Sequence, residues 1–162
     1  MKIILFFAAF LLQDAPAVPT KEDAAGTLER FYEAVRQGAE AERIDAAREA
    51  LQTPHSDVIK SVGKLLTRDT ERVRIAVALA LGDVDHPTSV QILNAGVRAN
   101  LKFKAVLAAI ATSQGKLGWE SSASPLHQLL KDIGKEEIRA IIPEAIKALG
   151  AIGSTSSIEP LL

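Results

Sequence analysis

The sequence predicts an all-α fold, a right-handed α-solenoid (α-α superhelix) built from antiparallel helix pairs. Three observations favour this fold: aliphatic residues are abundant while aromatic residues are rare, apolar residues recur at helical steps, and similar segments repeat along the chain. Of the 162 residues, 48% are hydrophobic and only 4% are aromatic. A sheet protein would be expected to contain more aromatic and β-branched residues.

The repeat is clearest in four alanine-rich segments that align on Leu51, Leu81, Ile110 and Leu149. Each segment is followed by a break that contains polar residues, proline or glycine, and then by a second run of apolar residues. The apolar residues in these runs recur every three or four positions, which indicates helices. Each unit is therefore predicted to be two helices joined by a short turn. Short helices of this kind bury too little surface alone, so we expect them to stack into one continuous core.

Capping residues and helix breakers set the predicted helix ends. Thr20 and Asp23 resemble a capping box, and Gly38 ends the first helix. Pro143 falls inside a predicted helix, where a kink or a restart is expected because proline lacks a backbone N–H. Further candidate N-caps are Ser56, Asp69 or Thr70, and Thr88 or Ser89. The predicted helices span residues 21–37, 40–52, 56–67, 70–83, 88–99, 101–113, 122–134, 136–151 and 156–162.

One segment, from Asp69 to Pro87, has an Asp followed by a Val-Arg pair that ends at Arg74, and then an Ala-Leu-Gly that ends at Gly82. A second Ala-Leu-Gly ends at Gly150. These motifs resemble the bacterial HEAT repeat of the phycobilisome-lyase-like type over roughly residues 40–162, which implies the armadillo-type helical architecture. The resemblance implies structural roles in stacking and capping for Asp69 and Arg74. It also implies that Gly82 and Gly150 occupy equivalent structural positions in their repeats. The next unit departs from the pattern, because it has Lys-Phe-Lys at residues 102–104 in place of Val-Arg.

The N-terminus has the pattern of a secretory signal peptide. A lysine at position 2 precedes an apolar run over residues 3–12, and Ala15-Pro16-Ala17 is a typical cleavage site, so we expect cleavage after Ala17. An apolar run of this length spans about 15 Å as a helix, roughly half of a membrane's hydrocarbon core. No stable membrane span is therefore expected in the mature chain, although an uncleaved anchor is the alternative.

These patterns divide the chain into a signal peptide at 1–17, an N-terminal helical pair at 18–54, and HEAT-like repeats at 55–162, the last one incomplete. The mature protein is expected in the periplasm or outside the cell.

The sequence offers little material for catalysis. It contains no cysteine, and its three histidines are His55, His86 and His127. The spacings typical of zinc proteases, serine hydrolases and nucleotide-binding loops are missing. A net charge of −1 argues against a nucleic-acid partner. We therefore expect no enzymatic activity, no metal, no cofactor and no small-molecule ligand.

Candidate binding residues are an aromatic residue and several cations. Trp119 lies in residues 113–125, a stretch predicted to be a long loop, where it either packs over neighbouring helices or anchors a partner. Arg72, Lys102 and Lys104 belong to a basic set that is either a solvated face or a surface for an anionic partner. The same set includes a stripe at four-residue steps, formed by Lys60, Lys64 and Arg68.

We accordingly expect a non-catalytic protein–protein interaction scaffold of the bacterial cell envelope that holds a protein or peptide on its concave face. The alternative is a lyase-like HEAT repeat enzyme, or an enzyme accessory, that acts on a cofactor-bearing protein.

Overall fold

A computed structural model of the chain describes residues 18–131 and 139–153. This part of the chain is helical apart from short turns, as the sequence predicts. The N-terminal helices are α1 (Lys21–Gln37), α2 (Glu40–Ala50), α3 (Ser56–Gly63), α4 (Leu65–Arg68) and α5 (Glu71–Leu81). They are followed by α6 (Pro87–Ala99), α7 (Lys104–Leu117), the 3-10 helix η1 (Glu120–Ser122), α8 (Ala123–Lys131) and α10 (Ile142–Ile152).

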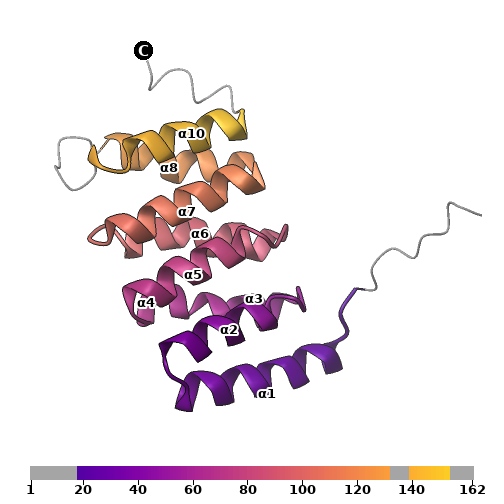
Figure 1. Cartoon of the computed structure of the whole chain (residues 1–162). Coiled ribbons are helices and arrows are strands. Elements are labelled where there is room, and N and C mark those ends of the chain that lie inside the picture. Colours follow the sequence, from indigo (N-terminus) through magenta and orange to yellow (C-terminus); the bar gives the residue numbers. More distant parts are fainter. Residues whose placement is uncertain (1–17, 132–138, 154–162) are drawn as a thin grey trace, which may run out of the picture.

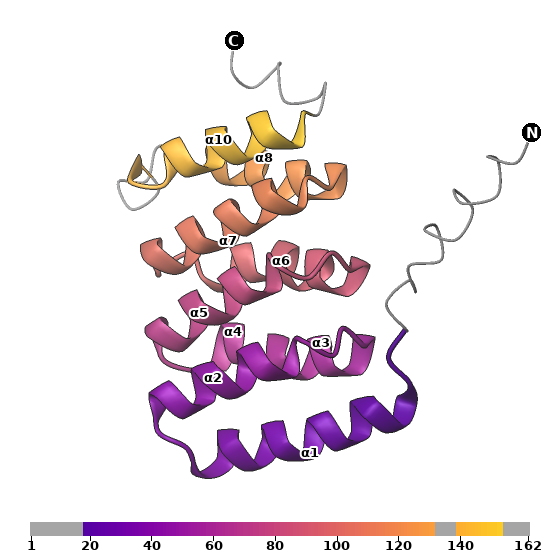
Figure 2. The ribbon, with the colours of Figure 1, turned by 45° about the vertical axis from the view of Figure 1, so that its right-hand side comes forward.

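The helices stack in chain order as two layers (Figures 1 and 2). One layer, called the inner-helix layer below, consists of α2, α5, α7 and α10, each packed against the next. The other, called the outer-helix layer, consists of α3 and α4, then α6, then α8. Helix α1 packs against α2 and α3 at one end of the stack. The layers and the order of contacts confirm the predicted α-solenoid.

Small residues let successive inner helices approach closely. A Cβ atom added to Gly82, which ends α5, would lie 2.6 Å from Cβ of Ser113 in α7 and 2.9 Å from its Cα. A Cβ atom added to Gly115 would lie 2.8 Å from Cα of Ala148 in α10. Both distances are shorter than an atom can tolerate, so these positions require glycine unless the helices move apart.

Histidines cap two helices of the outer-helix layer, which corrects the predicted N-caps Ser56, Thr88 and Ser89. The Nδ1 atom of His55 accepts a hydrogen bond from the backbone N–H of Asp57 (3.2 Å). His86 accepts one in the same way from Thr88 (3.0 Å). An imidazole nitrogen two positions before the amide thus replaces the hydroxyl that the sequence suggested.

Two other predicted caps are confirmed. Thr20 and Asp23 form a capping box, and the hydrogen bonds that Thr20 donates lower the pKa of Asp23. Thr70 caps α5 by accepting from the backbone N–H of Val73 (3.4 Å).

The predicted long loop over residues 113–125 is wrong, because α7 continues to Leu117 and only Gly118 and Trp119 separate it from η1. The polar residues that suggested a loop face neighbouring helices instead of solvent. Ser113 donates a hydrogen bond to the carbonyl of Ala78 (2.8 Å), and buried Gln114 donates to Asn94 (2.8 Å). Gly118 ends the helix in the left-handed conformation, with φ of 69°.

The C-terminal part agrees with the prediction for Pro143. Pro143 lies in the first turn of α10, so the chain restarts a helix there, as expected. The cap of α10 is Gly153, with φ of 65°, while Gly150 lies within the helix. The predicted signal peptide at 1–17 and the helix predicted at 156–162 lie outside the described residues.

Arginine side chains connect successive repeats at one edge of the stack. Arg43 donates two hydrogen bonds to Asp69, from Nε to Oδ2 (2.9 Å) and from Nη2 to Oδ1 (2.7 Å). One repeat later, Arg74 donates from Nη1 to Oδ1 of Asn100 (3.2 Å), and its guanidinium lies 4.5 Å from the ring centre of Phe103. Arg74 also donates to the backbone carbonyl of Asp69 (2.7 Å), so the two contacts are joined. We call these contacts the arginine ladder.

The ladder predicts a pH-dependent contribution to stability. The hydrogen bonds from Arg43 hold the pKa of Asp69 below its usual value, so the contribution is present above the unfolded pKa of about 3.9 and disappears as the pH falls through the folded pKa. Asp69→Asn should lower the free energy of unfolding by about 1–3 kcal/mol at pH 7. In urea titrations from pH 7 to pH 3, the difference from wild type should shrink below about pH 4.

The matched control is Asp45→Asn, because the Asp45 side chain is 77% exposed and its ion pair with Arg48 should contribute little. An equal loss of stability for the two variants at pH 7 would contradict the role assigned to Asp69.

Alanine should have opposite effects at two glycines, one in the close contact between α5 and α7 and one on an open side of α10. Gly82→Ala should destabilise the protein by about 1–3 kcal/mol, because the new Cβ atom meets the backbone of Ser113. Gly150→Ala should stabilise it by up to about 1 kcal/mol, since Gly150 is helical and no described atom lies within 4 Å of the added Cβ. Thermal unfolding of the two variants measures both effects, and the same sign for both would contradict this packing.

Candidate functional site

A groove runs between α2 and α5 on the inner-helix layer. Two adjoining hollows of about 330 and 500 Å³ share Arg48, Ala76 and Leu79, and we call them together the α2–α5 groove. Leu79 is 45% exposed, which is high for a leucine in the middle of a helix. Charged side chains of both signs line the groove beside Leu79 and Ile75: Asp45, Arg48, Arg72 and Asp83. The groove thus offers apolar surface next to charged groups.

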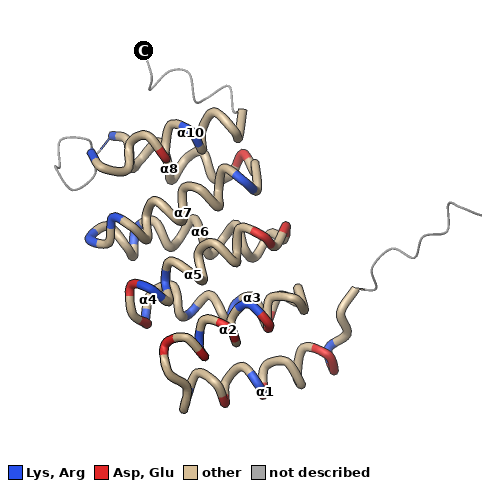
Figure 3. The backbone as a smooth tube through the Cα atoms, viewed as in Figure 1, with Lys and Arg blue, Asp and Glu red and all other residues tan. Residues whose placement is uncertain are grey.

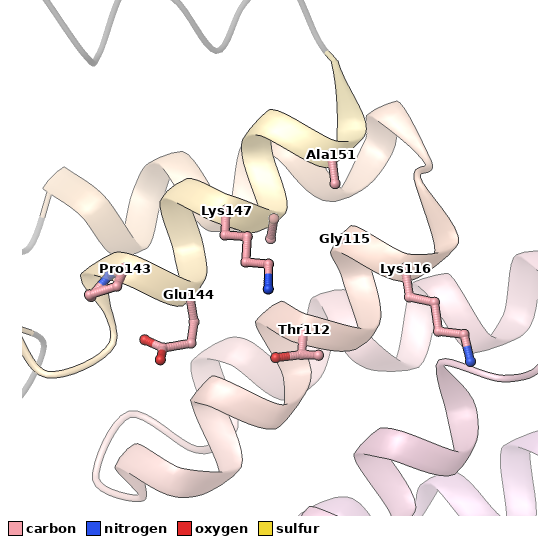
Figure 4. Close-up of a pocket in the computed structure, with 8 residues that line it drawn as sticks. Thr112, Gly115, Lys116, Pro143, Glu144, Lys147 and Ala151 are labelled. Carbon is pink, nitrogen blue, oxygen red and sulfur yellow. The ribbon is translucent and has the colours of Figure 1, made fainter.

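A second groove, of about 530 Å³, lies between α7 and α10 (Figure 4). Glu144 and Lys147 project from α10 over the side of α7 that carries Thr112 (Figure 4). Lys116 points away from them and pairs with Asp83 in the turn after α5. The Oε2 atom of Glu144 is shielded from solvent and has no hydrogen-bond partner among the described residues. We call this the α7–α10 groove.

Trp119 lies between α7 and η1, in the turn where the chain crosses from the inner to the outer layer. Its indole Nε1 donates a hydrogen bond to Oδ1 of Asp85 (2.8 Å), in the turn between α5 and α6. The side chain therefore joins two successive turns on the same edge of the stack. It is still 36% exposed, so part of its surface is accessible to a partner.

The structure does not bring the four candidate binding residues together. Arg72 lines the α2–α5 groove and pairs with Glu40 (3.4 Å). Lys102 and Lys104 are exposed in and after the turn between α6 and α7. Trp119 follows the opposite end of α7, and a helix of 14 residues is about 21 Å long. These residues therefore belong to at least two separate surfaces.

Sequence reasoning missed Leu79 and Ile75 as surface residues. Helix α5 is almost entirely apolar from Val73 to Leu81, so its pattern does not show which side faces solvent. A helix that is apolar on all sides within a two-layer stack must expose some of these residues, because each layer covers only part of it. This composition was the signal that an apolar groove would lie beside α5.

The three histidines lie at different places in the stack and do not form a common site. His55 and His86 each cap a different helix, and His127 lies in α8. Within residues 18–131 and 139–153, no three histidine or carboxylate side chains gather in a group suited to a metal ion. In the same ranges, no helix is both long and apolar enough to cross a membrane.

Comparison with protein families matches residues 28–102 to HEAT repeats and residues 144–162 to the PBS lyase HEAT-like repeat. The first match begins within α1 and ends just after α6, and the second begins within α10. No curated protein and no solved structure matches the chain. The two matched segments agree with the stacked helix pairs and with the motifs around Arg74 and Gly150. The chain therefore belongs to the HEAT repeat proteins and has repeats of the phycobilisome-lyase-like type.

Proposed function

We propose that this HEAT repeat protein is a non-catalytic scaffold of the bacterial cell envelope, and that it binds a protein or peptide on the inner-helix layer. The observation that supports this most strongly is the α2–α5 groove, where exposed Leu79 is surrounded by charged side chains. Extended surfaces of helical repeats generally serve binding. Interfaces between proteins typically combine an apolar centre with a polar rim, and this groove has both.

The proposed occupant is a peptide or loop that places an apolar side chain on Leu79 and Ile75. Charged residues of the partner would then lie near Arg48, whose side chain is 61% exposed, and Arg72, whose side chain is 79% exposed. Because Asp45 and Asp83 line the same groove, a partner with both signs of charge is favoured over a purely acidic one. The inner-helix layer is expected to be the concave side of the stack.

The chemistry of the described residues also supports a non-catalytic role. Two of the three histidines already accept hydrogen bonds as helix caps, and the three lie on separate helices or turns. The carboxylates of the α2–α5 groove interact with cations: Asp45 with Arg48, and Asp83 with Lys116. A general acid–base pair would need two groups that converge on a substrate, whereas each of these carboxylates lies beside a cation on an exposed surface.

The alternative is an enzyme, or an enzyme accessory, that acts on a cofactor-bearing protein. One observation favours it: the α7–α10 groove contains Glu144 and Lys147 and lies where the match to the PBS lyase HEAT-like repeat begins. At about 530 Å³ this groove is slightly larger than either of the two α2–α5 hollows, and it contains ionisable groups, as a site for chemistry would require.

Affinity capture tests the scaffold. The mature protein should retain a partner from a solubilised envelope fraction of its native cell, and Leu79→Glu should reduce the amount retained at least tenfold by placing a charge on the apolar surface. Gln128→Glu is the control, since it adds the same charge at an exposed position of α8 in the outer-helix layer.

Equal retention by the two variants would contradict binding at the α2–α5 groove. The captured partner also separates the two proposals, because the alternative requires a partner with a bound cofactor. Visible absorbance in the retained fraction, lost in Lys147→Ala but kept in Leu79→Glu, would favour the alternative.

Export is proposed on the pattern of residues 1–17 and makes a separate prediction. Expression of the full chain in a bacterial host should give a periplasmic product whose intact mass corresponds to a chain that begins at Val18. Replacing Ala15 and Ala17 by larger residues should block cleavage, because the peptidase requires small side chains at these positions. A cytoplasmic product that retains Met1 or Lys2 would contradict export and leave the repeat-based proposal standing.

A further inference from the structure

Five cations are exposed on one side of the outer-helix layer. Lys60 in α3, Lys64 between α3 and α4, and Arg68 in α4 follow one another at four-residue steps. Arg98 lies near the end of α6, and Lys102 lies in the turn that follows it. We call these five residues the basic stripe; Figure 3 shows cations along α3, α4 and the end of α6.

The two parts of the basic stripe lie on neighbouring helices, and they adjoin where α4 and α6 end. Helices α3 and α4 pack against α6. The side chain of Asn100 donates a hydrogen bond to the backbone carbonyl of Leu66 (3.2 Å) and another to Gly96 (2.9 Å). Arg68 is two residues from Leu66, and Arg98 is two residues from Asn100. The first of these hydrogen bonds joins the end of α4 to the end of α6, so Arg68 and Arg98 lie at adjoining helix ends, and Lys102 follows in the next turn.

The cations of the stripe are not paired with carboxylates of the described residues, although Asp69 and Glu71 follow Arg68 closely in the chain. None of the five cations forms an ion pair with a carboxylate of the described residues, whereas Arg43, Arg48, Arg72 and Lys116 all do. Across α3, α4 and α6, the single carboxylate is Asp57, which lies at the start of α3 beside His55. Unpaired cations on one face produce a local positive potential even though the whole chain has a net charge of −1.

We propose that the basic stripe binds the headgroups of an anionic lipid membrane, so that the outer-helix layer faces the membrane and the inner-helix layer stays accessible. A lipid surface presents diffuse negative charge, which attracts separate, flexible cations without a shaped pocket. Leu101 lies beside Lys102 and is 37% exposed, so it can enter the boundary between headgroups and acyl chains.

An acidic protein is a poorer fit to the same surface. Protein interfaces depend on a buried apolar or aromatic centre and are depleted in lysine there. Three of the five stripe residues are lysines, and most exposed residues near them in the chain are small or polar, such as Thr67, Ala95 and Ala99. Leu101, between Arg98 and Lys102, is the single exposed large apolar side chain among the described residues of α3, α4, α6 and the turn after α6, which is too little for a buried apolar centre. The inference is independent of the α2–α5 groove and does not rest on its occupant.

Co-sedimentation of the mature protein with vesicles tests this proposal. At low salt, the protein should bind vesicles of phosphatidylglycerol and should not bind vesicles of phosphatidylcholine. The triple variant Lys60→Gln, Lys64→Gln, Arg68→Gln should bind phosphatidylglycerol on the order of 100-fold more weakly, since each cation near such a surface contributes about fivefold. Raising the salt concentration should weaken wild-type binding through screening.

The matched control is Lys21→Gln, Arg30→Gln, Arg36→Gln on α1, which removes the same charge from exposed positions outside the stripe. It should bind within a few-fold of wild type, and the thermal unfolding of both triple variants shows that they fold. Equal loss in the two variants would overturn the proposal, because binding would then depend on net charge alone. Failure of the wild type to bind phosphatidylglycerol would also overturn it, and binding to polyglutamate in that case would assign the stripe to an acidic protein.

Discussion

The close packing of α5, α7 and α10 is the constraint on which the rest of the structure depends. Gly82 meets Ser113, and Gly115 meets Ala148, at distances that exclude any side chain at the glycines. Short helices of this composition bury too little surface alone, so each is stable only against its neighbours in the stack. Because the contacts that hold one repeat are the same contacts that position the next, stability and the spacing of the repeats have a common origin.

This packing also determines where a partner can bind. Two neighbouring inner helices that touch through small residues bury the centre of their interface but leave a groove along its outer side. The α7–α10 groove lies directly over the contact between Gly115 and Ala148, and both residues line it. In the α2–α5 groove, the small side chain of buried Ala76 lines the floor, with Leu79 exposed one turn further on. The residues that allow close packing thus also produce the grooves.

The sequence was sufficient to predict the architecture but not the ends of every helix. Apolar periodicity and the motif around Arg74 predicted the stack, because both depend on contacts that recur in each repeat. Residues 113–117 were wrongly predicted as a loop, since Ser113 and Gln114 are typical of turns unless a neighbouring helix supplies hydrogen-bond partners. That supply depends on tertiary packing between residues far apart in the chain, which periodicity cannot show.

The same reasoning explains why the candidate binding residues predicted from the sequence do not form one surface. Cations could be recognised individually, but their pairing could not: Arg72 meets Glu40, which is 32 residues away in the chain, whereas Lys60 and Lys64 meet no described carboxylate.

The arginine ladder and the basic stripe therefore differ in what the positive charge does. In the ladder, Arg43 and Arg74 are held by Asp69, Asn100 and Phe103, so their charge is used to connect repeats. In the stripe, the cations have no such partners within residues 18–131 and 139–153, so their charge is not used in the ion pairs of this part of the fold. A cation that is not paired within the fold is available to an external anion. Diffuse attraction to a charged membrane surface does not require the cation to lose its hydration water. The two layers of the stack can accordingly bind different partners without competing for the same side chains.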